Sequence, residues 1–107
     1  MVYVANAFSV GMLDGDAILR VKKVSIEKAR EILTHNDFVS AVGHESTAKV
    51  MSELLQINIP FNRIQIRLNR GDRLLLFQLL ERLPEGAVLS KEEVMRIPHQ
   101  FFVIDVI

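Results

Sequence analysis

Residues 72–83, DRLLLFQLLERL, contain an almost unbroken apolar run, and a core must form around them. A helix built from this stretch would be apolar nearly all round, which indicates that it is largely buried. Pro84 and Gly86 follow in the sequence LPEG, and both residue types end helices. We therefore predict a buried helix over residues 72–83, entered through a turn at residues 69–72, NRGD.

The segments on either side of this stretch carry strand patterns. Residues 63–68, RIQIRL, alternate strictly between polar and apolar side chains, as a half-buried strand does. Residues 100–107, QFFVIDVI, are mostly apolar, which is typical of a strand near the centre of a sheet. Residues 1–7 and 17–25 are also predicted strands, because both contain several β-prone valines.

Capping and spacing signals predict two longer helices and one short helix. Residues 25–35 begin with a serine that can cap a helix, and their apolar residues share one face. Residues 45–56 show a similar apolar stripe, and SKEE at residues 90–93 is a capping box that opens a brief helix. Residues 36–43, NDFVSAVG, are either a short strand or an irregular segment, and residues 87–89, AVL, are a candidate short strand.

Together these elements predict one α/β (α+β) domain over residues 1–107, with a mixed sheet of four to five strands packed against helices. Half of the residues are apolar and 24% are charged, which is the balance of a globular protein. The absence of cysteine excludes disulfides and thiolate sites, and it suits a cytoplasmic protein.

Two further classes of protein are disfavoured by the sequence. The chain has 13 basic and 13 acidic residues, and this balance argues against a protein that coats long nucleic acid. The first ten residues lack the basic n-region of a signal peptide, and no stretch has the composition of a spanning helix, so no membrane association is expected.

His44 carries the main chemical signal, because it precedes a predicted helix whose unpaired N–H groups can bind an anion. Ser46 and Thr47 follow in the first turn, and Arg63 and Arg82 each lie next to a predicted helix break. Arginines that hold an anion and an imidazole that protonates a leaving oxygen suit metal-independent phosphodiester cleavage. In RNA the neighbouring 2′-hydroxyl can serve as the nucleophile.

These residues also have purely structural interpretations, which stay open at this point. His44 alone is typical of a capping or surface histidine, and hydroxyl residues after it are typical of any helix start. The four arginines between residues 63 and 73 are typical of a solvated edge, and Arg82 with Glu85 is typical of a surface ion pair. His35 and His99 lie far from His44 in the sequence, so no metal site is predicted.

The sequence resembles the ring nucleases first described as viral type III anti-CRISPR proteins, a family with bacterial and archaeal relatives. The resemblance runs from about Tyr3 to Gly86 and rests on four blocks in order and at family spacing. The blocks are VYVANAFSVGML (residues 2–13), GHESTAKVMSELL (43–55), FNRIQIRLNRGDRLL (61–75) and QLLERLPEG (78–86). The resemblance implies a homodimer that binds cyclic tetra-adenylate and cleaves it, without a metal or cofactor, to linear di-adenylate with cyclic 2′,3′-phosphate ends.

The resemblance also implies roles for individual residues. His44 would be the general acid, and Glu85 would lie close to the catalytic centre, either orienting His44 or fixing Arg82. Gly11 stands where some relatives carry a polar side chain, so one ligand contact of the family is absent here or is made by backbone. The implied ligand contacts are Asn6, Ser9, Ser46, Thr47, Arg63, Gln78 and Arg82.

Three functions therefore compete at the level of sequence. The first is a ring nuclease in the cytoplasm of a prokaryotic host, which switches off or evades type III CRISPR defence. The second is a protein that binds or sequesters cyclic oligoadenylate without cleaving it. The third is a structural phage or plasmid protein that has no nucleotide ligand.

Overall fold

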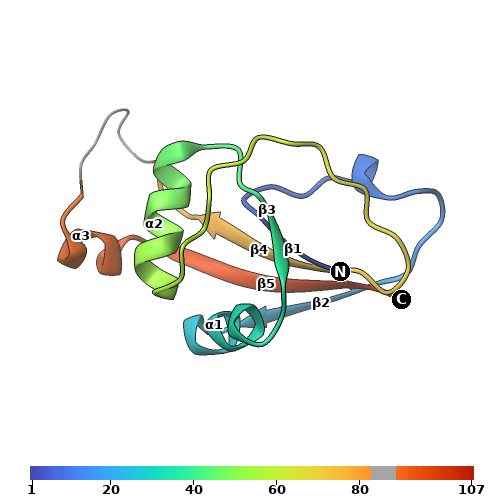
Figure 1. The fold of residues 1–107 in the computed structure, drawn as a ribbon, viewed down its shortest axis with the longest axis horizontal. Coiled ribbons are helices and arrows are strands. Elements are labelled where there is room, and N and C mark those ends of the chain that lie inside the picture. The colour runs from blue at the N-terminus through green and yellow to red at the C-terminus, as the bar shows by residue number, and fades with distance from the viewer. Residues whose placement is uncertain (83–88) are drawn as a thin grey trace.

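The computed structural model describes residues 1–82 and 89–107, which form a five-stranded sheet and three α-helices (Figure 1). In sheet order the strands are β2 (Leu19–Val24), β5 (His99–Val106), β4 (Arg73–Leu79), β1 (Val2–Ala5) and β3 (Phe38–Ala41). Strand β1 is parallel to β3 and β4, whereas β5 is antiparallel to β4 and β2, so the predicted mixed sheet is confirmed. The helices are α1 (Ile26–Thr34), α2 (Glu45–Leu55), α3 (Lys91–Arg96) and a 3₁₀ turn at Val10–Met12.

The predicted helix over residues 72–83 is wrong, because this stretch contains the strand β4. β4 lies at the middle of the sheet between β5 and β1. Leu75 and Phe77 belong to the core on one face of the sheet, and Leu74 and Leu76 belong to the core on the other. A strand buried on both faces has apolar residues in succession, and over this length its sequence cannot be told from that of a buried helix.

Each face of the sheet carries its own hydrophobic core. On one face the three α-helices pack against Val4 and Phe77 through a continuous cluster of buried side chains. On the other face two irregular segments, residues 8–13 and 61–68, cover Leu74 and its neighbours. Figure 1 shows the second of these segments as the long yellow-green trace after α2. The sheet is therefore a scaffold with helices on one side and loops on the other.

Residues 63–68 form no regular strand, contrary to the prediction from their alternation. Their burial alternates only over residues 65–68, where Ile66 and Leu68 are buried and Arg67 is exposed, whereas Ile64 is exposed. The N–H of Leu68 donates to the carbonyl of Met12 at 2.8 Å, in an isolated bridge rather than a strand ladder. The segment lies against a face of the sheet instead of extending its edge, so its second half shows the burial pattern of a strand without becoming one.

The remaining predicted elements are confirmed with shifted boundaries. Helix α1 is capped by Ser25, whose Oγ accepts from the N–H of Lys28 at 3.1 Å. Helix α3 begins with the predicted capping box at Ser90. The ambiguous residues 36–43 contain strand β3. The candidate strand at residues 87–89 falls largely outside the described residues.

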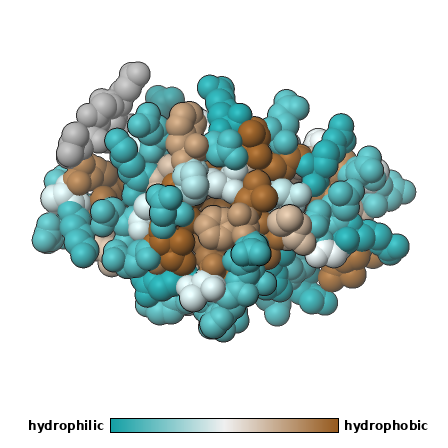
Figure 2. Space-filling model, in the orientation of Figure 1, coloured by the Kyte–Doolittle hydropathy of each residue, from teal (hydrophilic) through white to brown (hydrophobic). Residues whose placement is uncertain are grey.

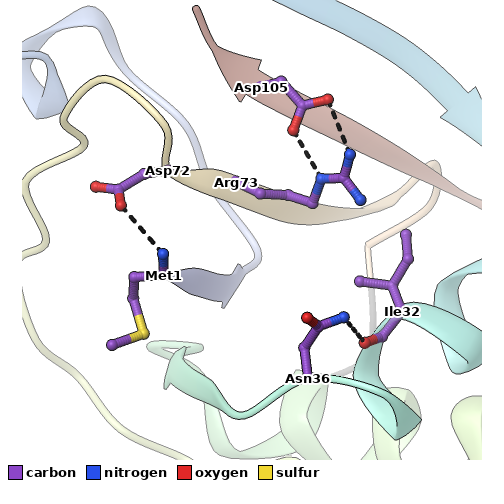
Figure 3. A network of polar contacts seen from close by, with 6 residues as sticks. All are labelled: Met1, Ile32, Asn36, Asp72, Arg73 and Asp105. Carbon is purple, nitrogen blue, oxygen red and sulfur yellow. Dashed lines mark hydrogen bonds and ion pairs between the residues drawn. The ribbon is translucent and has the colours of Figure 1, made fainter.

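Polar contacts lie at the end of the sheet where β1 and β4 begin and β5 ends (Figure 3). Arg73, at the start of β4, donates to Asp105 of β5 through Nε at 2.7 Å and through Nη2 at 3.2 Å. This hydrogen bonding raises the pKa of the Arg73 guanidinium above its ordinary value. Arg73 is therefore a partly exposed arginine that is paired with Asp105. The Met1 ammonium lies 3.4 Å from Asp72, which fixes the chain just before β1.

The surface seen in the same orientation is hydrophilic around its rim, with apolar residues in its middle (Figure 2). Some exposed apolar surface comes from the segment 61–68, where Phe61 is 50% and Ile64 is 45% exposed. Within residues 1–82 and 89–107, no helix combines the length and the apolar character needed to cross a membrane.

Candidate functional site

The carboxyl ends of two neighbouring parallel strands bring Asn6 and His44 together. Ala5, the last residue of β1, is paired with Ala41, the last residue of β3. Asn6 directly follows β1, and His44 follows β3 by three residues, so the two side chains emerge at the same edge of the sheet. Ligands in parallel sheets commonly bind outside this edge, because loops rather than backbone ladders occupy it.

A hydrogen-bonded chain links Asn6 to the segment that carries His44. The backbone N–H of Gly43 donates to Asn6 Oδ1 at 3.2 Å. Asn6 Nδ2 lies 2.9 Å from His44 Nδ1. The side chain of His44 is exposed, so this bond orients a ring that is otherwise open to solvent. Asn6 therefore contacts the candidate catalytic group directly.

His44 occupies the N-cap position of α2 without capping the helix through its ring. Its backbone is extended, with φ −131° and ψ 125°, and its carbonyl accepts from the N–H of Ala48 at 3.0 Å. Its side chain makes no capping hydrogen bond. His44 is therefore an exposed N-cap residue, in agreement with the interpretation as a capping or surface histidine, but its ring bonds to Asn6 rather than to the N–H groups of the helix.

The irregular segment after α2 brings Arg63 to the same place. Asn62 donates through its backbone N–H to the carbonyl of Val42 at 2.9 Å and through Nδ2 to the carbonyl of Ser40 at 2.8 Å. These bonds fix the segment beside the end of β3. A methyl group placed on Gly43 would lie 3.6 Å from Arg63 Cγ, so the stem of this arginine runs next to the residue before His44. Arg63 is exposed and can turn its guanidinium to an anion.

Three hydroxyl residues predicted to contact ligand differ in their exposure. Ser9 is exposed at the start of the 3₁₀ turn, and its side chain makes no capping bond. Ser46 is exposed in the first turn of α2, next to His44. Thr47 is only 7% exposed, so little of its surface is open to a ligand. Ser46 is therefore the hydroxyl of α2 that is better placed for contact.

Gln78 and Arg82 lie on β4 and just after it, not on a helix as predicted. Gln78 is exposed near the carboxyl end of the strand, and its Oε1 accepts from Gln100 Nε2 at 2.6 Å. Arg82 is exposed three residues after the strand ends. Because β1 and β4 are parallel, both residues belong to the same end of the sheet as Asn6. Glu85, and with it the suggested ion pair to Arg82, falls outside the described residues.

The sequence did not reveal the hydrogen bonds that hold the residues of this site in place. Asn6 was expected as a ligand contact, but its bonds to Gly43 and His44 depend on the pairing of β1 with β3, which no local pattern shows. Asn62 was not expected at all, although its position directly before Arg63 was a weak signal. In the part of the chain that the structure describes, histidines and acidic residues form no group of three or more that could hold a metal ion.

Comparisons with known proteins place this chain among relatives from viruses and one bacterium. It is 38% identical to protein 26 of Sulfolobus islandicus filamentous virus, over all of this chain and 92% of that protein. It is 38% identical to the ORF117 protein of Acidianus two-tailed virus, over 83% of this chain and 78% of that protein. It is 30% identical to YddF of Bacillus subtilis, over 79% of this chain and 81% of that protein.

A solved structure has the same fold. Protein B116 of Sulfolobus turreted icosahedral virus matches with a TM-score of 0.85 and 28% identity, over 97% of each chain. The family model described as STIV B116-like matches residues 2–101, which include every described residue of the candidate site. The chain therefore belongs to the STIV B116-like family.

Proposed function

We propose that this protein is a ring nuclease that cleaves cyclic tetra-adenylate to linear di-adenylate with 2′,3′-cyclic phosphate ends. The observation that carries the proposal is the exposed His44 ring, bonded to Asn6 at the carboxyl ends of parallel strands and flanked by the stem of Arg63. An orientated imidazole beside an arginine suits acid catalysis on a phosphodiester. The substrate is taken from the resemblance of four sequence blocks to the ring nucleases.

The proposed reaction is a transesterification within RNA. The 2′-oxygen of one ribose attacks the adjacent phosphorus, and the bond from phosphorus to the 5′-oxygen of the next ribose breaks. The 2′-hydroxyl proton is released to water, and the departing 5′-oxygen receives a proton from the general acid, His44. The products are a cyclic phosphate and a free 5′-hydroxyl, so no water is consumed and no metal is required by the stoichiometry.

The proposal includes a two-fold homodimer, because the ring has a symmetry that a two-fold axis can match. Each protomer would present the same site to half of the ring, and two copies of His44 would act on opposite phosphodiesters. Arg63 and Arg82 of both chains would hold the phosphates through charge-assisted hydrogen bonds. A local group of arginines can do this while the whole chain has a net charge of zero.

The viral relatives fit a protein that disarms a host defence, and the bacterial relative YddF fits a protein that switches the same response off. In either setting the enzyme would work in the cytoplasm of the prokaryotic host, where type III CRISPR complexes make cyclic tetra-adenylate as a second messenger. The alternative function is sequestration of cyclic oligoadenylate without cleavage.

An assay of purified protein with cyclic tetra-adenylate in excess EDTA tests the proposal. We expect linear di-adenylate with a cyclic phosphate end, because the proposed reaction uses a proton donor and arginine side chains that hold the phosphates rather than a bound metal ion. The products are resolved by chromatography and mass spectrometry. Binding without product would establish the sequestering protein instead, and absence of binding would remove the nucleotide from the function.

Arg63→Ala is expected to weaken the binding of cyclic tetra-adenylate by about 10- to 100-fold, the loss typical of a charge-assisted hydrogen bond to phosphate. Isothermal titration or filter binding measures it, in the His44→Ala background so that the ligand stays intact. Arg70→Ala is the matched control, because Arg70 is also exposed but precedes β4 at the opposite end of the sheet. Equal affinities of the two variants would remove Arg63 from the site.

A further inference from the structure

The amide of Asn6 is held in one orientation by a partner that can only donate. The backbone N–H of Gly43 donates to Oδ1 of Asn6 at 3.2 Å, and a peptide nitrogen has no lone pair to accept a bond in return. The oxygen of the amide must therefore face Gly43. The amide nitrogen, which carries two hydrogens and accepts nothing, then faces His44.

This orientation selects one tautomer of the neutral His44 ring. Asn6 Nδ2 lies 2.9 Å from His44 Nδ1, and a hydrogen bond at that distance requires Nδ1 to be the acceptor. A ring that accepts at Nδ1 is neutral and carries its hydrogen on Nε2. Nε2 lies on the far side of the ring from Asn6, and the side chain is exposed, so this hydrogen is available to a ligand.

We propose that Asn6 is a positioning residue, which acts through His44 by fixing the orientation of the ring and the tautomer of its neutral form, with the hydrogen on Nε2. This rests on the proposed function only where it concerns the reaction, because the tautomer is a property of the free protein. The role differs from the ligand contact that the resemblance implied for Asn6, since Oδ1 is taken by Gly43 and one hydrogen of Nδ2 by His44.

The arrangement has a consequence for proton transfer. The neutral ring presents its only N–H hydrogen on Nε2, the nitrogen that lies away from Asn6. With the contact intact, His44 therefore donates a hydrogen bond from Nε2 toward the phosphate or the departing oxygen. Loss of Asn6 frees the ring to turn or to change tautomer, which removes this donor from the departing oxygen.

The tautomer is tested by nitrogen NMR of the free protein, labelled with ¹⁵N, at a pH where the ring is neutral. Long-range correlations between the carbon-bound ring hydrogens and the ring nitrogens report which nitrogen is protonated. The His44 signals are assigned as those that disappear in His44→Gln. We expect Nε2 protonated and Nδ1 unprotonated in the wild type. Asn6→Asp is the decisive variant, because both of its oxygens accept: one can keep the Gly43 bond, and the other will draw a hydrogen onto Nδ1.

Identical ring nitrogen shifts in the wild type, Asn6→Asp and Asn6→Ala would overturn the proposal, because they would show that the amide does not bond to the ring. Asn69→Ala is the control, since Asn69 is exposed and lies before β4 at the other end of the sheet. It should leave the His44 signals unchanged. None of these NMR outcomes depends on cleavage. Failure of the wild type to cleave cyclic tetra-adenylate would therefore contradict the proposed function but not the proposed tautomer of His44.

Kinetics then separate positioning from ligand binding. Asn6→Ala should lower the single-turnover rate at saturating cyclic tetra-adenylate by about 10- to 100-fold, the usual loss for a residue that orients a functional side chain. The dissociation constant should stay within about threefold, because the ligand does not need the amide. A weakened affinity with an unchanged rate at saturation would make Asn6 a ligand contact and overturn its positioning role.

Discussion

His44→Ala is expected to lower the single-turnover rate of cyclic tetra-adenylate cleavage by about 10²- to 10⁴-fold, the range that a positioned acid contributes. The ring is exposed and bonded to Asn6, so its removal deletes a hydrogen-bond donor without opening a cavity in the core. Affinity should change by less than about threefold, because arginines rather than the imidazole hold the phosphates. Quenched-flow or manual sampling with saturating protein measures the rate.

His35→Ala provides the control for this substitution. His35 is also exposed, but it follows α1 and precedes β3, so it lies at the opposite end of the sheet. The His35→Ala variant should cleave at the wild-type rate. A His44→Ala variant whose rate stays within a few-fold of the wild-type rate would contradict the assignment of His44 as the acid.

The fold class could be predicted from the sequence because most local signals were unambiguous. Serine caps located α1 and α3, and the apolar stripe located α2. The error fell on β4, where both faces are buried and periodicity carries no information. Residues 63–68 misled for the converse reason, because an irregular segment that packs Ile66 and Leu68 on a sheet face can carry the same sequence alternation as a strand. Local patterns report burial, and hydrogen-bond partners depend on the rest of the chain.

The candidate site was predictable to the extent that it depends on residue type. His44 before a helix and Arg63 were both expected as site residues, and the structure places the stem of Arg63 next to Gly43, the residue before His44. The contact between Asn6 and His44 was not, because it joins residues 38 positions apart through the pairing of two strands. Placing Gln78 and Arg82 on a helix was a direct consequence of the error on β4.

The division of the sheet explains where these residues are found. The face covered by helices supplies most of the buried side chains, whereas the irregular segments on the other face carry Ser9 and Arg63. Residues in loops on a rigid sheet can be substituted without disrupting the hydrophobic core of the protein. Asn6 and His44 differ from these two, because Asn6 follows β1 directly and His44 follows β3 by only three residues, so both lie close to the ends of paired strands.

Phe77→Ala is expected to reduce the free energy of unfolding by about 3–5 kcal/mol, the usual effect of removing a buried aromatic ring. Phe77 has no exposed surface, and its ring lies 5.0 Å from that of Phe101 and 5.7 Å from that of His99. It also belongs to the cluster that joins β4 to the helices, so its loss leaves a cavity that several elements border. Urea unfolding followed by circular dichroism measures the change.

Leu80→Ala is the matched control, and it also distinguishes a strand from a helix at this position. In a helix, residues 77 and 80 would share a face, and truncation of either would open the same core. In the strand, Phe77 is buried while Leu80, just beyond its end, is 55% exposed. Leu80→Ala should therefore change the free energy of unfolding by less than about 0.5 kcal/mol. A loss comparable to that of Phe77→Ala would contradict the placement of β4.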